Sequence, residues 1–343
     1  MKITLQEVSL NLEHAFITAR KNIKSNTSLL IEIYDVEASL TGIGECVIAD
    51  FFGDTVSSVK ADLERVIPFL EQWEDPFSIE KLNRVLARDL KIRNSARSAI
   101  IMAIYDLVGK KTGLPLFKLW GLSIEKDYLS SYTIGIDTPD IIRKKAEAAA
   151  QYPLLKIKLG SEKDLELLEI IKSVTNARLI VDANCGWTLT KLKDIMSTLV
   201  DLGVELIEQP FPPAAEDDYR KLKQTSKIPI FADESLKDQR DLKLIESLFH
   251  GINIKLVKCG GLYDALIMAH TAQALNLKVM IGCMIESSVA ITAASHLAPL
   301  ADYLDLDGNI LITNDPYIGV KNISGKLKLP TDPGIGVKRR EPK

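Results

Sequence analysis

The chain has 343 residues, of which 26% are charged, and its formal net charge at pH 7 is −3. Basic residues form no dense run with interleaved aromatic side chains, so the composition argues against nucleic acid as a partner. A parallel α/β barrel takes roughly 250 residues, so a barrel with a smaller second domain is the expected division.

The beginning of the chain, MKITLQEVSLNL, alternates like a strand and lacks the apolar stretch and cleavage site of a signal peptide. No run of 18 uninterrupted apolar residues occurs. We therefore expect a cytoplasmic protein with no membrane partner. The four cysteines follow no paired spacing, which favours reduced thiols over a disulfide framework.

The first part of the chain reads as strands followed by helices. Strand-like segments occupy residues 3–12, 28–35 and 40–47, and helical periodicity follows at 55–72, 78–90 and 95–111. The polar segment 14–27 is expected to be a loop. Phe51 and Phe52 indicate either a lid over an apolar group or packing under a helix. Because strands precede helices as a block, residues 1–122 are expected to form an α+β domain of their own.

Residues 123–308 alternate between strands and amphipathic helices. The eight strand-like segments are SSYTIGI, LLKIKLG, LIVDAN, LIEQP, IFADES, GINIKLVK, LKVMIGCM and DYLDLDG. This order predicts an α/β fold, a modified, TIM-like (β/α)7β barrel in which the last helix is missing or replaced. The turn-rich tail, 309–343, is expected to return to the N-terminal domain.

One carboxylate stands at the end of each of three successive predicted strands, namely Asp182, Glu208 and Asp233. The spacings are 26 and 25 residues, the period of a βα repeat, so the three acids should converge at one face of the barrel. Buried together they would raise one another's pKa unless a cation neutralised them. Oxygen ligands without Cys or His favour one Mg²⁺ ion, with Mn²⁺ as a substitute. The alternative is that each acid caps the helix after its strand.

Two lysines share one face of the strand LLKIKLG. Lys156 and Lys158 are two residues apart, so they point the same way while the apolar neighbours face the helices. This parity places both lysines inside the barrel. A surface strand, with the lysines in water, is the alternative.

Lys255 has the same parity as Asn253 in GINIKLVK and lies across the barrel from Lys158, with the three acidic strands between. A pair of lysines that face each other across a metal ion is well placed for acid–base chemistry at one carbon. One lysine can remove a proton from one face of the carbon, and the other can return a proton to the opposite face. Burial and neighbouring cations are expected to lower the lysine pKa toward a useful range. A salt bridge from Lys255 to Asp233 is an alternative or additional role.

Asp305 and Asp307 share a face at the end of the last predicted strand. Three roles are open to them: further metal ligands, a site for a cationic group of the substrate, or caps of loops.

Taken together, the motifs KIK, DAN, EQP, ADES, NIK and DLD resemble those of the enolase superfamily, in its muconate-lactonising branch, and most closely the dipeptide epimerases of the L-Ala-D/L-Glu type. The resemblance covers nearly the whole chain. It implies a capping domain built from the N-terminal region and the C-terminal tail, and a (β/α)7β barrel.

The resemblance also implies a role for each site residue. The three acids bind Mg²⁺, Lys158 and Lys255 are the two bases, and Lys156 helps to stabilise the enolate. Asp305 and Asp307 bind the α-ammonium group of the dipeptide. The remaining residues assigned to the substrate site are Thr133, Met284 and Glu286, the last of which matches a family residue near the site at the end of the seventh strand.

In one respect the sequence departs from relatives that act on a C-terminal Glu. Those carry an Arg that pairs with the Glu side chain, and an ungapped alignment puts Lys21 there, beside Arg20. Either residue could take over that contact. The expected function is therefore Mg²⁺-dependent epimerisation of the C-terminal residue of a dipeptide, with L-Ala-D/L-Glu as the first candidate, by a homo-oligomer of the chain.

Competing functions remain. Within the superfamily, o-succinylbenzoate synthase or cycloisomerase activity shares both lysines but needs no ammonium site. A dipeptide epimerase for hydrophobic or cationic residues is another option. A binding protein without catalysis is disfavoured, because it would have no reason to bury two bases.

Overall fold

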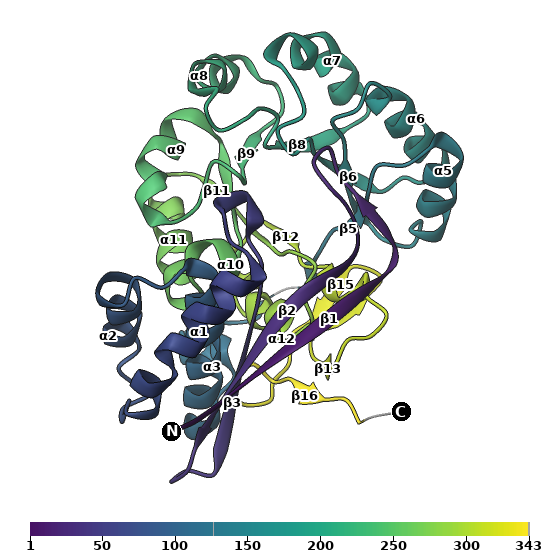
Figure 1. Cartoon of the computed structure of the whole chain (residues 1–343). Helices are drawn as coiled ribbons and strands as arrows, with labels where there is room; N and C mark the ends of the chain where they lie inside the picture. The colour runs from purple at the N-terminus through teal and green to yellow at the C-terminus, as the bar shows by residue number, and fades with distance from the viewer. Residues whose placement is uncertain (126, 342–343) are drawn as a thin grey trace.

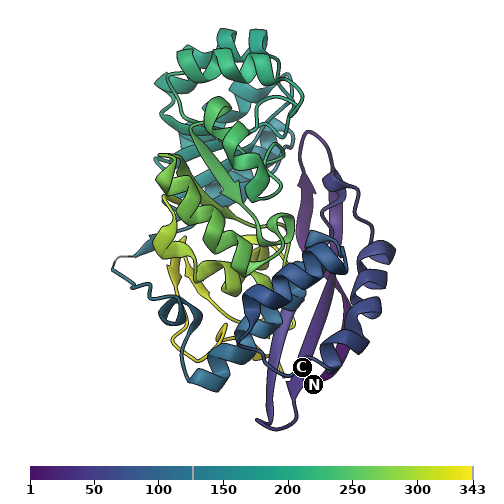
Figure 2. The ribbon, with the colours of Figure 1, turned by 90° about the vertical axis from the view of Figure 1, so that its left-hand side faces the viewer.

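The structure is a computed structural model that describes residues 1–125 and 127–341. Within these ranges, helices are either too short or too polar to cross a membrane. The four cysteines are all free thiols. Figures 1 and 2 show a barrel with the N-terminal sheet and helices packed along one side of it.

The N-terminal region combines one antiparallel sheet with helices. Its elements are β1 (Lys2–Ile17), β2 (Asn22–Asp35), β3 (Leu40–Val47), the short η1 (Asp50–Phe52), α1 (Val56–Glu71), α2 (Ile79–Arg84), η2 (Val85–Asp89), α3 (Asn94–Thr112) and α4 (Leu116–Leu119). The sheet order is β1-β2-β3. The prediction of strands before helices is therefore confirmed.

The expected loop 14–27 is wrong for most of its length. The pairing of β1 with β2 resumes after an irregularity and continues through Phe16 with Ile23 and Ile17 with Asn22. This end of the hairpin is a partly buried ribbon held by its backbone ladder, with no fully buried side chains, so its sequence shows no clear apolar alternation that would reveal it. The hairpin reaches over the mouth of the barrel (Figure 1).

Eight parallel strands form a nearly closed barrel, as predicted. They are β5 (Tyr132–Ile134), β6 (Leu154–Lys158), β7 (Arg178–Asp182), β8 (Val204–Glu208), β9 (Ile230–Ala232), β10 (Gly251–Ile254), β11 (Lys278–Gly282) and β12 (Tyr303–Asp305). They follow one another in chain order around the sheet. A parallel bridge between Ser130 and Leu304 joins the two ends.

Helices fill the gaps between barrel strands. They are α5 (Pro139–Ala148), α6 (Asp164–Val174), α7 (Leu189–Asp201), α8 (Glu216–Thr225), η3 (Gln239–Asp241), α9 (Leu242–Leu248), α10 (Leu256–Cys259), α11 (Leu262–Ala274), α12 (Ser288–Ser295) and η4 (Ala298–Leu300). After β12 the chain makes one 3-10 turn, η5 (Gly308–Ile310), in place of an eighth helix. The strand predicted to run to Lys258 ends at Ile254, because the chain turns into α10.

Alternate residues of the barrel strands point inward and form layers. The floor is an apolar cluster of one residue from each of five strands, Leu154, Ile180, Leu206, Phe231 and Met280. Gly251 leaves room for the Phe231 ring, since a Cβ there would lie 2.5 Å from it. Two residues further along β6, β7, β8 and β9, the inward positions are polar, namely Lys156, Asp182, Glu208 and Asp233. The apolar floor thus closes one end of the barrel and leaves the chemistry to the other.

The C-terminal tail contacts the N-terminal region. It contains β13 (Tyr317–Ile318), β14 (Lys321–Ile323), β15 (Lys326–Lys328) and β16 (Lys338–Arg339), and β15 pairs with β4 (Tyr128–Leu129) below the barrel. Buried Asp106 on α3 accepts hydrogen bonds from the backbone N–H groups of Ile43 and Ile335, at 2.9 and 2.8 Å. We propose that the chain divides into three parts, residues 1–122, 123–308 and 309–343. Residues 342 and 343 lie outside the part that the structure describes.

Helix α3 lies against β3 at two glycines. A Cβ on Gly44 would come within 1.9 Å of the Ala99 carbonyl oxygen, and one on Gly42 within 2.0 Å of the Ala103 oxygen. Backbone atoms on both sides leave little freedom to relax. The stability of residues 1–122, which we call the capping region, therefore depends on this close approach of helix and sheet.

We predict that Gly44→Ala lowers the free energy of unfolding by about 1 to 3 kcal/mol, because overpacking forces the helix away from the sheet. Urea unfolding followed by circular dichroism measures the change. Glu37→Ala, at an exposed turn of the same sheet, is the control and should change stability by less than about 0.5 kcal/mol. Equal stability of the Gly44 variant and the wild type would contradict the packing described here.

Candidate active site

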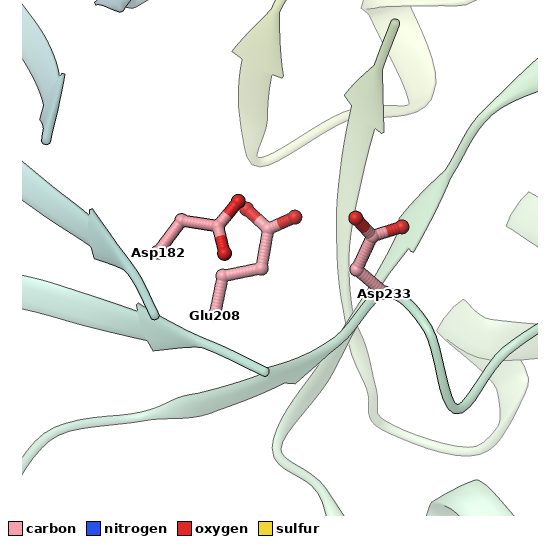
Figure 3. Close-up of side chains that lie close together, drawn as sticks. All are labelled: Asp182, Glu208 and Asp233. Atoms are coloured by element: carbon pink, nitrogen blue, oxygen red, sulfur yellow. The ribbon is translucent and has the colours of Figure 1, made fainter. Parts of the chain in front are cut away.

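Three carboxylates converge at the polar end of the barrel. Asp182 ends β7, Glu208 ends β8 and Asp233 follows β9, and all three are buried. Each offers an oxygen within 4.8 Å of the other two. Figure 3 shows the carboxyl groups gathered at one place beyond the strand ends. The predicted convergence is therefore confirmed.

The alternative role as helix caps does not hold. Helix α7 is capped by the Thr188 side chain, which accepts a hydrogen bond from the Lys191 N–H, and α8 begins after Ala215. The turn after β9 is capped by Asp238. The three acids are thus free of the helix ends and face the barrel interior.

The surroundings of Glu208 fit a cation. Asn253 donates a hydrogen bond to its Oε1 at 2.8 Å. Its Oε2 lies 2.7 Å from Lys156 Nζ without hydrogen-bond geometry, and no other group in the described residues donates to it. Burial and the charge of Asp182 raise the pKa of Glu208 to about 8. A buried carboxylate with a raised pKa and an oxygen that accepts no hydrogen bond is what a hard cation would stabilise.

Each predicted lysine is buried and paired with a carboxylate. Lys158 Nζ lies 2.6 Å from Asp182, and Lys255 Nζ lies 2.9 Å from Asp233, the salt bridge considered as an additional role. Lys156 lies among three acids, at 2.7 Å from Glu208, 2.7 Å from Asp305 and 3.2 Å from Asp182. The surface-strand alternative is therefore wrong.

For Lys255, the expected lowering of the pKa is wrong when only the charges of the protein itself are considered. Burial works against the charged form of Lys156 and Lys255, but the neighbouring carboxylates outweigh it and raise the pKa of both. Burial likewise opposes ionisation of Asp182 and Asp233, and the lysines reverse that effect and lower their pKa. Acids and lysines stabilise one another's charged forms.

Sequence reasoning missed Lys258. Its Nζ is buried, forms an ion pair with the Asp233 carboxylate and donates to the backbone oxygens of Asp233, at 2.7 Å, and Asn253, at 3.1 Å. If the strand continued, Lys258 would have the opposite parity to Lys255 and would point away from the barrel interior. Because α10 begins at Leu256, the Lys258 side chain points toward the site instead. A lysine in an apolar run was the available signal.

A second missed group lies beside the triad. Glu234 is buried and accepts hydrogen bonds from Asn184 Nδ2 and from Arg20, both at 3.2 Å. Asn184 belongs to the motif DAN and Glu234 to the motif ADES. From the sequence, only Asp182 and Asp233 in these two motifs have an expected role. Arg20 also stacks on Phe51, with its guanidinium carbon 4.3 Å from the ring centroid.

Asp305 and Asp307 face the same space from the last strand. Asp305 pairs with Lys156 and accepts a hydrogen bond from Ser131 Oγ at 2.6 Å. Asp307 accepts the Thr133 N–H at 2.6 Å and makes no side-chain cap to η5, so the loop-cap alternative is wrong for it. Burial and the charge of Asp305 raise the pKa of Asp307 to about 6.

A cavity of about 400 Å³ lies over these groups, between the barrel and the β1–β2 hairpin. Its lining includes the predicted site residues Lys156, Lys158, Lys255, Asp233, Asp305, Asp307, Thr133, Met284, Arg20 and Lys21. Phe51 and Phe52 also line it, which favours the lid interpretation. Buried Glu286 does not line the cavity; its Oε2 accepts the Met284 N–H at 3.3 Å. The structure therefore gives Glu286 no direct contact with a ligand there.

Comparisons with known proteins agree with this geometry. Residues 1–121 match the mandelate racemase / muconate lactonizing enzyme N-terminal domain, and residues 141–343 match the enolase C-terminal domain-like family. L-Ala-D/L-Glu epimerase of Bacteroides thetaiotaomicron is 42% identical over 330 residues, 95% of this chain and 85% of that protein. L-Ala-D/L-amino acid epimerase of Flavobacterium johnsoniae is 36% identical over 324 residues, 93% of this chain and 94% of the relative.

A solved structure extends the likeness to the whole fold. Dipeptide epimerase from Enterococcus faecalis V583, in complex with Mg and the dipeptide L-Leu-L-Tyr, aligns with a TM-score of 0.93 at 30% identity and covers 98% of this chain and 99% of its own. Both family models and the identities over nearly full length point the same way. The chain is an isomerase that belongs to the dipeptide epimerases of the enolase superfamily, in the mandelate racemase / muconate lactonizing branch.

Proposed function

We propose that this chain is a Mg²⁺-dependent epimerase that inverts the Cα of the C-terminal residue of a dipeptide by two-base proton transfer. L-Ala-D/L-Glu is the first candidate substrate. The observation that carries the proposal is the position of Lys158 and Lys255 on opposite sides of the carboxylate triad, both lining one cavity. Three acid-bearing strands separate them around the barrel.

Asp182, Glu208 and Asp233 would hold the metal ion. When bound, Mg²⁺ supplies a Lewis acid for the carboxylate of the substrate. The residues that remain have distinct tasks. Asn253 orients Glu208 through its hydrogen bond, and Lys258 fixes Asp233. Lys156 places a positive charge among the acids, where negative charge develops as the α-proton leaves.

The two bases act from opposite faces of Cα. In its neutral form, one lysine takes the α-proton at Nζ, and the protonated lysine opposite returns a proton to the other face. Inversion follows because the proton leaves and arrives on different sides. Hydrogen bonds to Asp182 and Asp233 hold the two Nζ atoms in place. By family resemblance, Lys158 serves the L-configured residue.

The far end of the cavity suits the dipeptide α-ammonium group. Asp305 forms an ion pair with Lys156. Asp307 accepts a hydrogen bond from the Thr133 backbone N–H and forms no ion pair with a lysine in the described residues. An ammonium group would offset the burial and the charge of Asp305, which raise the pKa of Asp307, and would favour its ionised form. We therefore assign Asp307 the principal contact and Asp305 the supporting one.

The substrate side chain would face the hairpin tip and the loop after β3. Lys21 pairs with Asp50 at 2.5 Å, and both side chains are exposed, by 39% and 48%. Such a pair contributes about 0 to 1 kcal/mol, so a substrate carboxylate could replace Asp50 at Lys21. Arg20 is already bound to buried Glu234 and is less free.

A second candidate is a preference for hydrophobic residues. With Arg20 and Lys21 both paired with acids, the apolar side chains Phe16, Ile23 and Phe52 form part of the remaining lining near them. The dipeptide bound by the Enterococcus faecalis relative, L-Leu-L-Tyr, is of this kind. A lysine also matches a carboxylate less well than an arginine does, so we expect a broad substrate range.

The metal proposal predicts that exhaustive chelation abolishes epimerisation and that Mg²⁺ or Mn²⁺ restores it. Glu208→Gln should weaken Mg²⁺ binding, measured by calorimetry, and lower kcat at least about 100-fold, because one ligand charge is lost. Glu205→Gln, on the same strand but away from the site, is the control. Unchanged turnover in metal-free enzyme would refute the assignment.

The two-base proposal predicts a split between stereoisomers. Lys158→Ala should abolish epimerisation and α-proton exchange of L-Ala-L-Glu in D₂O, while L-Ala-D-Glu still exchanges. Lys255→Ala should do the reverse. Mass spectrometry of the recovered dipeptides measures the deuterium. Equal exchange of both isomers by either variant would mean that one base serves both faces.

The specificity proposal predicts opposite effects at one ion pair. Asp50→Asn should raise kcat/KM for L-Ala-L-Glu relative to L-Ala-L-Leu by up to about 5-fold, equivalent to about 1 kcal/mol, because Lys21 loses its competitor. Lys21→Met should lower the same ratio by a similar factor. Steady-state kinetics with both dipeptides give the ratios. If neither substitution moves them, Lys21 does not read the side chain, although the epimerase assignment stands.

A further inference from the structure

The strand that carries Lys255 leaves the sheet before it reaches the lysine. Strand β10 ends at Ile254, and Lys255 is the first residue of the turn that becomes α10. Lys158, by contrast, is within β6 and pairs in register with Asp182 on β7. The backbone at Lys255 therefore lacks the sheet support that Lys158 has.

The capping region supplies support from outside the barrel. Asn94, at the start of α3, donates its side-chain amide to the Lys258 carbonyl at 2.6 Å. Arg97, one turn later, donates to the Cys259 carbonyl at 3.1 Å. Both carbonyls belong to the turn that begins at Lys255, so two side chains of α3 hold its far end.

Arg97 is itself held rigidly. It is 6% exposed and forms a buried ion pair with Asp264 on α11. It also donates to Asn83 at 2.8 Å and to Asn94 at 2.9 Å. A planar guanidinium satisfied on several sides fixes both direction and distance.

The turn contacts the Arg97 guanidinium so closely that a side chain at Gly260 would not fit. Gly260 has φ +100°, and a Cβ there would lie 2.1 Å from the Arg97 terminal nitrogen. On the inner side of the same turn, Lys258 donates to the backbone oxygens of Asp233 and Asn253. The turn is thus clamped between the capping helix and the ends of β9 and β10, with Lys255 at its first position.

We propose that Arg97, with Asn94, is a positioning residue for Lys255, so that the capping region controls one of the two bases. The inference rests on the two-base function proposed above. Arg97 touches no group of the cavity that holds the substrate; it acts through the α10 backbone. A shift of this turn by about 1 Å would cost on the order of 100-fold in proton transfer at Lys255 and leave Lys158 in place.

The experiment compares α-proton exchange of L-Ala-L-Glu and L-Ala-D-Glu in D₂O, each isomer separately. Arg97→Lys keeps the charge opposite Asp264 but loses the fork that reaches Cys259, and Asn94→Ala removes the second contact. We expect exchange at the face served by Lys255 to fall by about 10- to 100-fold in Arg97→Lys, with little change at the other face. Asn94→Ala should show a smaller split in the same direction.

Arg93→Lys is the matched control. Arg93 lies one turn before Arg97, and its side chain forms an ion pair with Asp62, whereas that of Arg97 reaches a carbonyl of α10. It should leave both exchange rates unchanged. Thermal unfolding of each variant identifies any loss of folded protein, which would lower both rates together.

An equal loss for both isomers, or no loss for either, would overturn the positioning role while leaving the two-base function intact. A wild-type enzyme that exchanges neither isomer, nor any other dipeptide, would instead refute the proposed function, and the inference with it.

Discussion

Three carboxylates within 4.8 Å of one another, all buried, are the constraint on which the rest of the site depends. Such a group is stable only if positive charge surrounds it. Lysines on β6 and around the start of α10 provide that charge from two sides, and a metal ion would add to it. Lys158 on β6 and Lys255 after β10 are separated around the barrel by the three acid-bearing strands. The arrangement that balances the charges is therefore also the one that the proposed two-base chemistry requires.

Closure of the site comes from the N-terminal region. The long β1–β2 hairpin and the loop with Phe51 form one wall of the cavity, and the barrel provides the buried lysines and acids opposite them. Close packing of α3 on β3 fixes this region as a unit. Through Arg97 the same helix reaches the turn that begins at Lys255, and the proposed positioning role of Arg97 rests on this contact.

The sequence predicted the barrel and most of the site because strand ends recur at a regular spacing and side chains alternate along strands. Asp182, Glu208 and Asp233 follow from the spacing, and Lys156 follows from parity. Lys258 could not be found in this way, since parity fails where a strand ends and a helix begins. The end of the hairpin was missed because a ribbon with no fully buried side chains needs no apolar pattern, and the pairing of Arg20 and Lys21 with acids depends on segments distant in sequence.

The central claim is proton transfer between opposite faces of the C-terminal Cα, and the label in the product tests it most directly. A mixture of L,L-dipeptides is incubated with the Mg²⁺-loaded enzyme in D₂O, and product and remaining substrate are separated early in the reaction and weighed by mass spectrometry. The account predicts one deuterium at Cα of the C-terminal residue in the D-configured product. A product that keeps its original proton at Cα, or label at another carbon, would contradict it.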